Sequence, residues 1–221
     1  MRLILHNSWR SSASYRVRIG LGLKELAYEY VVVNTLQGEQ FADGYRAKNP
    51  MAQIPTLEIE HAGGAPVVLT QSLAILEYLE ERWPELSILP RDLYLRAKVR
   101  ALAEIINAGI QPFQNTPTIQ RIKQLGGDDR AWVQSFITTG LAAFARVATE
   151  TAGAFCVGDT PTIADCCLVP QLMAARRFGA ELDASCDVLF GIEARCLALP
   201  AFANALPDRQ PDAVHPGPGP R

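Results

Sequence analysis

The stretch LILHNSWRSSASYRVRIGLGLKELAYEYVVVN, residues 3–34, decides the fold because it places one helical segment between two strand-like ones. Residues 3–6 are a short apolar run, and residues 28–34 are rich in the β-branched and aromatic side chains that favour strands. Between them, apolar side chains recur at helical spacing: Tyr15, Ile19, Leu23 and Leu26. This order predicts a crossover that joins two parallel strands.

The rest of the first half continues the alternation of strands and helices. We expect a helix around 38–48, a hairpin of strands 56–60 and 67–70, and an amphipathic helix over 73–83 whose inward side chains are Leu73, Leu76 and Leu79. The resulting order, βαβα followed by ββα, predicts an α/β domain of thioredoxin-like architecture over residues 1–83. The hairpin adds an antiparallel edge to the parallel pair.

The second half has a different pattern. Residues 84–91 hold two prolines and no periodicity, which is typical of a linker. Residues 92–213 read as an all-helical domain, and residues 214–221 as a disordered tail. The expected helices are 92–115, capped by Asp92 and bent at Pro112; 129–153, ending at Gly153; and 162–179, opened by a capping box of Thr162 and Asp165.

Composition excludes several classes of function. The net charge of −2 gives no field that would attract nucleic acid, and no apolar run of about eighteen residues predicts a membrane span. The apolar run at the N-terminus is too short for a signal peptide. Three unclustered histidines argue against a metal site or a histidine-based triad. Five cysteines without a C-x-x-C pair predict reduced, buried thiols and a cytoplasmic location.

The junction before the first helix has two interpretations. Ser11 or Ser12 is an ordinary helix cap, since a serine hydroxyl satisfies a free backbone N–H there, and Arg10 is then a surface cation. However, a cation at a helix N-terminus opposes the helix dipole. An arginine in that place suggests an anionic ligand shared by the guanidinium and the helix end.

Two further stretches have the same ambiguity. Ile54-Pro55 precedes a strand, where a cis bond would make a tight turn and leave the Ile54 peptide group free to pair with an extended peptide. The alternative is a trans proline at a strand start. Gln71 and Ser72 open the next helix and suit a carboxylate, although a simple cap also explains them.

Together these stretches resemble the zeta class of glutathione transferases, the family that includes maleylacetoacetate isomerase and its close relative maleylpyruvate isomerase. The resemblance runs from Leu3 to about Ala213. The segments that carry it are SSASYRVRIGLGLK, NPMAQIPTLEI, QSLAILEYLEE, GIQPFQN, GDTPTIADCCLVPQ, ARRF and RQPDA. It implies a glutathione transferase fold, glutathione as the cofactor and a homodimer.

The resemblance also assigns candidate residues. Glutathione would bind along the ends of the sheet, with its sulfur near Ser11 and Ser12 as catalytic residues. The other residues implied in glutathione binding are Gln53, Ile54, Pro55, Gln71, Ser72, Gln111 and Asn115. The physical need is a thiolate, because a free thiol of pKa near 8.5 is mostly protonated at neutral pH. A hydroxyl donor and a helix N-terminus would lower that pKa.

The implied activity is a cis–trans isomerisation of a maleyl keto acid. The thiolate adds to the cis double bond, the bond rotates, and release gives the trans product, as from maleylacetoacetate to fumarylacetoacetate in aromatic catabolism. Arg10 and Arg177, or less directly Arg176, would bind the substrate carboxylates. The alternative for Arg176 and Arg177 is a solvated cationic helix end.

The sequence departs from the family pattern at two positions. Ala13 stands where the family often has a cysteine, and Tyr15 replaces a more usual tryptophan. Other functions stay open: maleylpyruvate isomerisation, general glutathione transfer or dehalogenation of α-halo acids, and a non-catalytic glutathione-binding scaffold. Intact Arg10, Ser11, Gln71 and Ser72 argue against the scaffold, which has no need for anion-binding groups.

Overall fold

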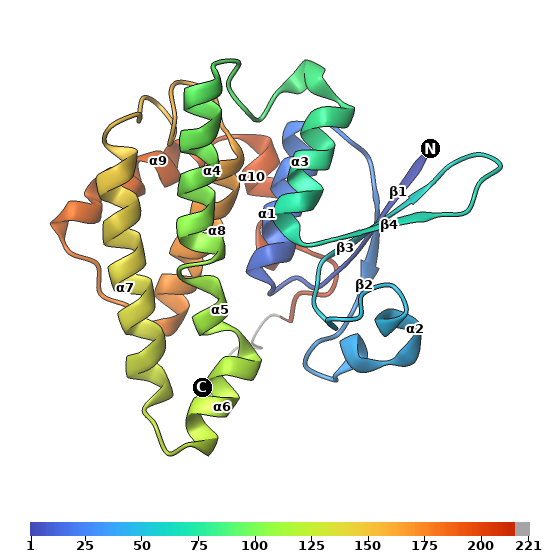
Figure 1. Cartoon of the computed structure of the whole chain (residues 1–221), viewed down its shortest axis with the longest axis horizontal. Helices are drawn as coiled ribbons and strands as arrows, with labels where there is room; N and C mark the ends of the chain where they lie inside the picture. The colour runs from blue at the N-terminus through green and yellow to red at the C-terminus, as the bar shows by residue number, and fades with distance from the viewer. Residues whose placement is uncertain (215–221) are drawn as a thin grey trace, which may run out of the picture. The chain divides into compact units, whose positions relative to one another are not determined.

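A computed structural model of the chain describes residues 1–214. The chain forms two compact units: Met1–Ser87 together with the stretch from Leu199 onward, and Ile88–Ala198. The first unit holds the sheet, and the second is built from helices (Figure 1). Among the described residues, no helix combines the length and apolarity needed to cross a membrane. The predicted tail lies, apart from Val214, outside the described residues.

The first unit has the predicted mixed sheet. Its elements are β1 (Arg2–Asn7), α1 (Ser12–Leu23), β2 (Glu29–Val32), β3 (Thr56–Glu60), β4 (Val67–Thr70) and α3 (Ser72–Arg82). The strand order is β2-β1-β3-β4, with β1 and β2 parallel and the other pairs antiparallel. The predicted parallel crossover and antiparallel hairpin are therefore confirmed.

One face of this sheet carries the core of the unit, under α1 and α3, which lie side by side (Figure 1). Alternate residues of β1 and β3 face the helices and are fully or nearly fully buried: Leu3, Leu5, Leu57 and Ile59. A Cβ on Gly20 of α1 would lie 2.2 Å from a Leu76 side-chain atom, so any side chain there would force Leu76 of α3 to move. On α3, Ile75 is buried while Leu73 is only half-buried, contrary to the expected inward position of Leu73.

The segment between β2 and β3 is less helical than predicted. Instead of one helix around 38–48, it contains a 3-10 turn, η1 (Glu39–Phe41), and a single-turn helix, α2 (Asp43–Arg46). The two are separate because Ala42 between them has an extended backbone. Tyr45 of α2 is buried, and its hydroxyl contacts the Thr56 hydroxyl at 2.9 Å on the sheet face opposite α1.

The last described residues belong to the first unit. They form α10 (Pro200–Asn204) and a 3-10 turn, η4 (Pro207–Arg209), and α10 packs against α1. Phe202 is fully buried, and the Ala205 carbonyl accepts a hydrogen bond from Arg18 of α1 at 3.2 Å. This differs from the predicted helical domain of 92–213, because long-range packing returns this stretch to the sheet-containing unit.

The second unit is a bundle in which α4, α7 and α8 pack against one another (Figure 1). Its α-helices are α4 (Leu93–Asn107), α5 (Gln111–Gln114), α6 (Thr116–Gln124), α7 (Asp129–Ala148), α8 (Ile163–Phe178) and α9 (Asp187–Leu197), with a 3-10 turn, η3 (Ala184–Cys186), before α9. The predicted linker contains another 3-10 turn, η2 (Pro84–Leu86). After it, Ile88 and Leu89 are buried, and the Ile88 carbonyl accepts from the Ile163 N–H at 3.0 Å.

The predicted helix boundaries of this unit are partly right. The Asp92 side chain caps α4 through the Leu95 N–H at 2.9 Å, and the Thr162–Asp165 capping box is present. The single helix expected over 92–115 is wrong, because α4 ends at Asn107 and a new helix, α5, begins at Gln111. Pro112 lacks an N–H and fits the first turn of that new helix. Helix α7 ends at Ala148 rather than at Gly153.

Candidate functional site

Ser11 is the N-cap of α1. Its side-chain oxygen accepts a hydrogen bond from the Ser14 N–H at 3.1 Å, and its own N–H donates to the Ser8 carbonyl at 3.2 Å. A serine hydroxyl has one proton to donate besides its acceptor lone pairs. The cap bond uses only an acceptor position, so the same hydroxyl keeps a proton for a ligand. Capping and anion stabilisation are therefore compatible roles for this side chain.

The start of α1 also offers backbone donors. Within residues 1–214, the N–H groups of Ser12 and Ala13 and the Ser12 hydroxyl have no hydrogen-bond partner. The first turn contains no acidic side chain that would neutralise the positive end of the helix dipole. Arg10, directly before Ser11, is exposed. This combination of donors and positive charge is suited to a bound anion.

The loop that precedes Ser11 is held by a buried arginine that sequence reasoning missed. Arg18 is 1% exposed and donates to the carbonyls of Ser8 at 3.3 Å and Trp9 at 3.1 Å, and to the Asn7 side chain at 3.0 Å. Burial lowers the pKa of Arg18, although an arginine keeps its charge in proteins. The sequence gives no distinct signal for a buried arginine, because an arginine at the same position of a helix is equally compatible with a solvent-exposed face.

The turn before β3 contains the predicted cis peptide bond between Ile54 and Pro55. The Gln53 carbonyl in this turn accepts from the Tyr45 hydroxyl at 2.6 Å and from the Asn49 side-chain amide at 2.6 Å. Among the described residues, neither the N–H nor the C=O of Ile54 has a partner. A free donor and a free acceptor on one residue match what an added extended peptide would need.

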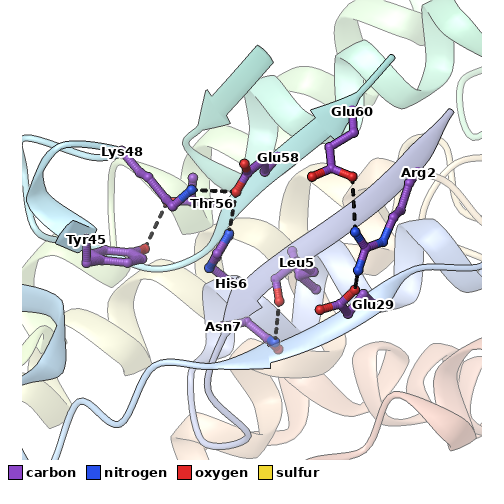
Figure 2. Close-up of polar contacts among 10 residues, drawn as sticks. All are labelled: Arg2, Leu5, His6, Asn7, Glu29, Tyr45, Lys48, Thr56, Glu58 and Glu60. Atoms are coloured by element: carbon purple, nitrogen blue, oxygen red, sulfur yellow. Dashed lines mark hydrogen bonds and ion pairs between the residues drawn. The ribbon is translucent and has the colours of Figure 1, made fainter. Parts of the chain in front are cut away.

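A polar network fastens the segment around Tyr45 to the sheet (Figure 2). The Glu58 carboxylate on β3 accepts from Lys48 at 2.6 Å and contacts the His6 ring at 2.8 Å. The bond from Lys48, followed by that from His6, holds the pKa of Glu58 below its ordinary value. Burial raises the pKa of Tyr45, so its phenol stays protonated and donates to Gln53.

Gln71 and Ser72 stand at the start of α3. Gln71 has φ +69° and ψ 116°, a left-handed backbone that is costly for a residue other than glycine and is typical of functional sites. Its amide donates to the Gln53 side chain at 3.2 Å. Ser72 is 5% exposed, and its hydroxyl accepts from the buried Arg16 of α1 at 3.3 Å. Sequence reasoning did not identify Arg16.

The structure thus brings the predicted residues of the first unit to two helix starts and the turn of Ile54 and Pro55. Both helices follow the C-terminal ends of strands, α1 after β1 and α3 after β4. The residues in question are Arg10, Ser11, Ser12, Gln53, Ile54, Pro55, Gln71 and Ser72. Side-chain hydroxyls, free N–H groups and an unpaired peptide group are present among these described residues, and the first turn of α1 contains no acidic side chain.

Four predicted residues lie in the second unit. Gln111 starts α5, and its Oε1 atom is shielded from solvent and has no partner within residues 1–214. Asn115 precedes α6, and its side chain makes no cap hydrogen bond. Arg176 forms a two-pronged ion pair with the buried Glu193, one contact of which measures 2.7 Å. Arg177 is exposed and lies over the Phe178 ring at 4.9 Å.

The cysteines are free and buried, as predicted: Cys156, Cys166, Cys167, Cys186 and Cys196. Burial raises the pKa of the Cys156, Cys166, Cys186 and Cys196 thiols, which makes them poor nucleophiles. In the part of the chain that the structure describes, no group of three or more His, Cys, Asp or Glu side chains could hold a metal ion.

Comparisons with known proteins identify the family of the chain. The family described as "Glutathione S-transferase, N-terminal domain" matches residues 10–82. The structure of maleylacetoacetate isomerase from Anaeromyxobacter dehalogenans 2CP-1 with bound GSH superposes with a TM-score of 0.88 at 51% identity, covering 96% of this chain and 98% of that one. A second structure of that protein holds dicarboxyethyl glutathione and citrate in the active site.

Two further relatives cover almost the whole chain. Maleylacetoacetate isomerase of Rhizobium meliloti (strain 1021) is 44% identical over 93% of this chain and 96% of its own length. The holo structure of a maleyl pyruvate isomerase, described as a bacterial zeta-class glutathione S-transferase, has a TM-score of 0.87 at 38% identity over 96% of this chain and all of that one. The chain therefore belongs to the zeta-class glutathione S-transferases, in the family of the maleylacetoacetate and maleylpyruvate isomerases.

Proposed function

We propose that this protein is a glutathione-dependent cis–trans isomerase that converts maleylacetoacetate to fumarylacetoacetate in the catabolism of aromatic compounds. The observation that carries the proposal is the start of α1, where the Ser11 hydroxyl proton and the N–H groups of Ser12 and Ala13 are available and the first turn contains no acidic side chain. A site of this kind stabilises an anion. Bound glutathione would supply that anion as a thiolate that adds reversibly to the cis double bond.

The residues of the first unit fit glutathione. The unpaired Ile54 peptide group beside Pro55 would pair with the peptide backbone of the ligand. Gln71 and Ser72 would bind its γ-glutamyl carboxylate, because the start of α3 adds backbone donors to their side chains. Gln53 would contact the glycyl end of the ligand. Tyr45 holds its backbone carbonyl, and the Gln71 amide donates to its side-chain oxygen.

In the second unit, Gln111 and Asn115 would complete the binding of glutathione. The Gln111 Oε1 atom lacks a partner among the described residues, and such a shielded polar atom is costly unless a ligand satisfies it. Asn115 has a side-chain amide that its own helix does not use. Both amides are able to donate and accept, which suits a peptide ligand.

The acid substrate would be bound by arginines. Arg10 is exposed at the positive end of α1, where it would neutralise a carboxylate near the reacting carbon. Arg177, at the exposed end of α8, is the arginine that the family resemblance assigns to the substrate. The guanidinium of Arg176 forms an ion pair with the buried Glu193. We therefore assign the second substrate carboxylate to Arg177 and a structural role to Arg176.

The proposal includes the location and the assembly state. Five free thiols are compatible with the reducing cytoplasm, where glutathione is also abundant. A homodimer is supported by large apolar side chains that a monomer would leave in water, Leu93 and Tyr94 at the start of α4, which are 81% and 65% exposed. Sedimentation of the purified protein tests this part.

The experiment that tests the function is a paired assay. Purified protein is incubated with glutathione and either maleylacetoacetate or maleylpyruvate, and the loss of the cis-enone absorbance is followed. Turnover of maleylacetoacetate at the higher kcat/KM supports the proposal. A higher kcat/KM for maleylpyruvate would instead make the protein a maleylpyruvate isomerase. That activity is the main alternative because a maleyl pyruvate isomerase is 38% identical to this chain. Consumption of dichloroacetate without isomerisation of either acid would contradict both.

A further inference from the structure

The C-terminal segment from Leu206 to Ala213 makes contacts that the proposed function has not used. It lies more than 190 residues from Ser11 in sequence, yet it reaches the loop that sets the start of α1. The Asp212 carboxylate accepts from the Trp9 N–H at 3.0 Å through one oxygen. Its other oxygen accepts from the Tyr30 hydroxyl of β2 at 2.5 Å.

The loop between β1 and α1 is also held through its carbonyls. The Asn7 carbonyl accepts from the Val33 N–H at 2.7 Å, and Arg18 binds the carbonyls of Ser8 and Trp9. Asp212 is the described partner of the Trp9 N–H, on the residue just before Arg10 and two before Ser11. Its loss would leave the N–H side of that peptide unpaired, with the Ser8 carbonyl still held by the Ser11 N–H and by Arg18.

The segment is built to hold Asp212 in place. The nearly buried Gln210 donates to the carbonyls of Asn204 at 2.9 Å and Leu206 at 2.8 Å, and its own carbonyl accepts from the Ala213 N–H at 3.0 Å. Burial and the bond to Asp212 raise the pKa of Tyr30, so its hydroxyl remains a donor. The carboxylate is thus bound at both oxygens, on a turn that is itself closed by hydrogen bonds.

We propose that Asp212 is a positioning residue that fixes the Trp9 peptide, and through it the geometry of Arg10 and Ser11 at the thiolate site. The inference rests on the proposed function and deepens it. It makes the distant C-terminal segment part of the machinery that lowers the thiol pKa, although Asp212 itself touches no substrate. A misplacement of about 1 Å at a reacting group is enough to cost up to about 100-fold in rate.

The test compares Asp212→Ala and the milder Asp212→Asn with Asp208→Asn. Asp208 is exposed in the same segment and has no hydrogen bond or ion pair within the described residues, so its change controls for loss of a carboxylate. Three quantities are measured: hydrogen exchange of the Trp9 amide without glutathione, the ultraviolet titration of the bound thiol, and kcat/KM. Thermal unfolding of each variant establishes that it is folded.

We expect Asp212→Ala to speed Trp9 amide exchange at least tenfold and to raise the midpoint of the thiol titration by about one pH unit. Isomerase kcat/KM should fall about tenfold, mainly in kcat, with a smaller effect for Asp212→Asn. If Asp212→Ala does not fold, Asp212→Asn provides the same three readouts. Asp208→Asn should match the wild type in all of them.

The inference is overturned if folded Asp212 variants keep the wild-type thiol titration, or if Asp208→Asn changes it equally. Lower thermal stability alone, with an unchanged titration, would show a purely structural role and would also overturn it. Measurements on the wild-type protein show separately whether the proposed function itself fails. If that protein binds glutathione and lowers its thiol pKa but isomerises neither acid, amide exchange and thiol titration still decide the role of Asp212. If it does not lower the pKa, both proposals fall.

Discussion

The guanidinium of Arg16 on α1 donates a hydrogen bond to the hydroxyl of Ser72 at the start of α3, across 3.3 Å. Both residues are buried, at 1% and 5% exposure. The bond joins the helix whose start is the proposed thiolate site to the helix whose start is the proposed carboxylate site. The two halves of the candidate glutathione site are therefore linked through a charged side chain rather than through apolar packing alone.

Ser72→Ala should weaken glutathione binding. The change removes a proposed ligand to the γ-glutamyl carboxylate and also deprives buried Arg16 of an acceptor, so we expect Kd to rise about tenfold, or about 1.4 kcal/mol. Isothermal calorimetry measures it directly. Ser135→Ala, on an exposed position of α7, is the matched control and should leave Kd unchanged. An unaltered Kd for Ser72→Ala would remove Ser72 from the site.

Arg176 and Arg177 should respond in opposite ways to truncation. Arg177→Ala should raise KM for the maleyl acid about tenfold or more at unchanged thermal stability, because it would lose a charge-assisted contact to a carboxylate. Arg176→Ala should instead destabilise the fold by about 1 to 2 kcal/mol, since it leaves the buried Glu193 carboxylate unpaired on one side. Steady-state kinetics and denaturant unfolding of both variants check the pair. The reverse pattern would move the substrate contact to Arg176.

Glu58 should contribute a pH-dependent stabilisation in acid. Lys48 and His6 hold its folded pKa below the ordinary value of 4.5, so ionised Glu58 stabilises the fold above that value. This contribution is lost as the pH falls through the lower, folded pKa. Glu58→Gln should therefore lower the free energy of unfolding by about 1 kcal/mol at pH 7. It should also make that free energy fall less steeply as the pH is lowered.

Urea unfolding between pH 7 and pH 3 measures this effect, with Glu81→Gln as the control because Glu81 is an exposed carboxylate near the end of α3. If the free energy of unfolding falls as steeply with pH in Glu58→Gln as in the wild type, the assigned ion pairs of Glu58 are contradicted.

The cysteines should not take part in catalysis. Ala13 occupies the position near the site where the family often has a cysteine, and all five thiols of the chain are buried. A thiol reagent should react slowly with the native protein and leave isomerase activity intact, because buried thiols of raised pKa are poor nucleophiles. Titration with an aromatic disulfide before and after unfolding in guanidinium measures this. Rapid modification of a native thiol with loss of activity would contradict it.

Local sequence patterns were enough for much of the sheet-containing unit and for two helix starts of the helical unit. The βαβ crossover, the hairpin, the cap at Asp92 and the Thr162–Asp165 box were predicted and are present. The local sequence left the Ile54-Pro55 bond open between cis and trans, and it is cis. Each depends on a few adjacent residues with a specific backbone preference. The roles of the predicted site residues stay predictions, although the first-unit residues among them gather at the two helix starts and one turn.

The features that the sequence could not reveal depend on distant contacts. Arg16 and Arg18 look like surface residues in a helical pattern, and only the packing of α3 and the C-terminal segment buries them. For the same reason, nothing local predicts that residues after Leu199 join the first unit. The break before Pro112 was expected only as a bend, because a proline pattern does not distinguish a kink from a new helix start.

The most direct test of the thiolate site is an ultraviolet titration of glutathione bound to the wild type and to Ser11→Ala. Donation from the Ser11 hydroxyl at the start of α1 predicts a bound thiol pKa at least one unit below the free value of about 8.5. In Ser11→Ala it should return by about one unit toward that value. A wild-type thiol that titrates as in free solution, or a Ser11→Ala titration that superposes on the wild type, would contradict the role proposed for Ser11.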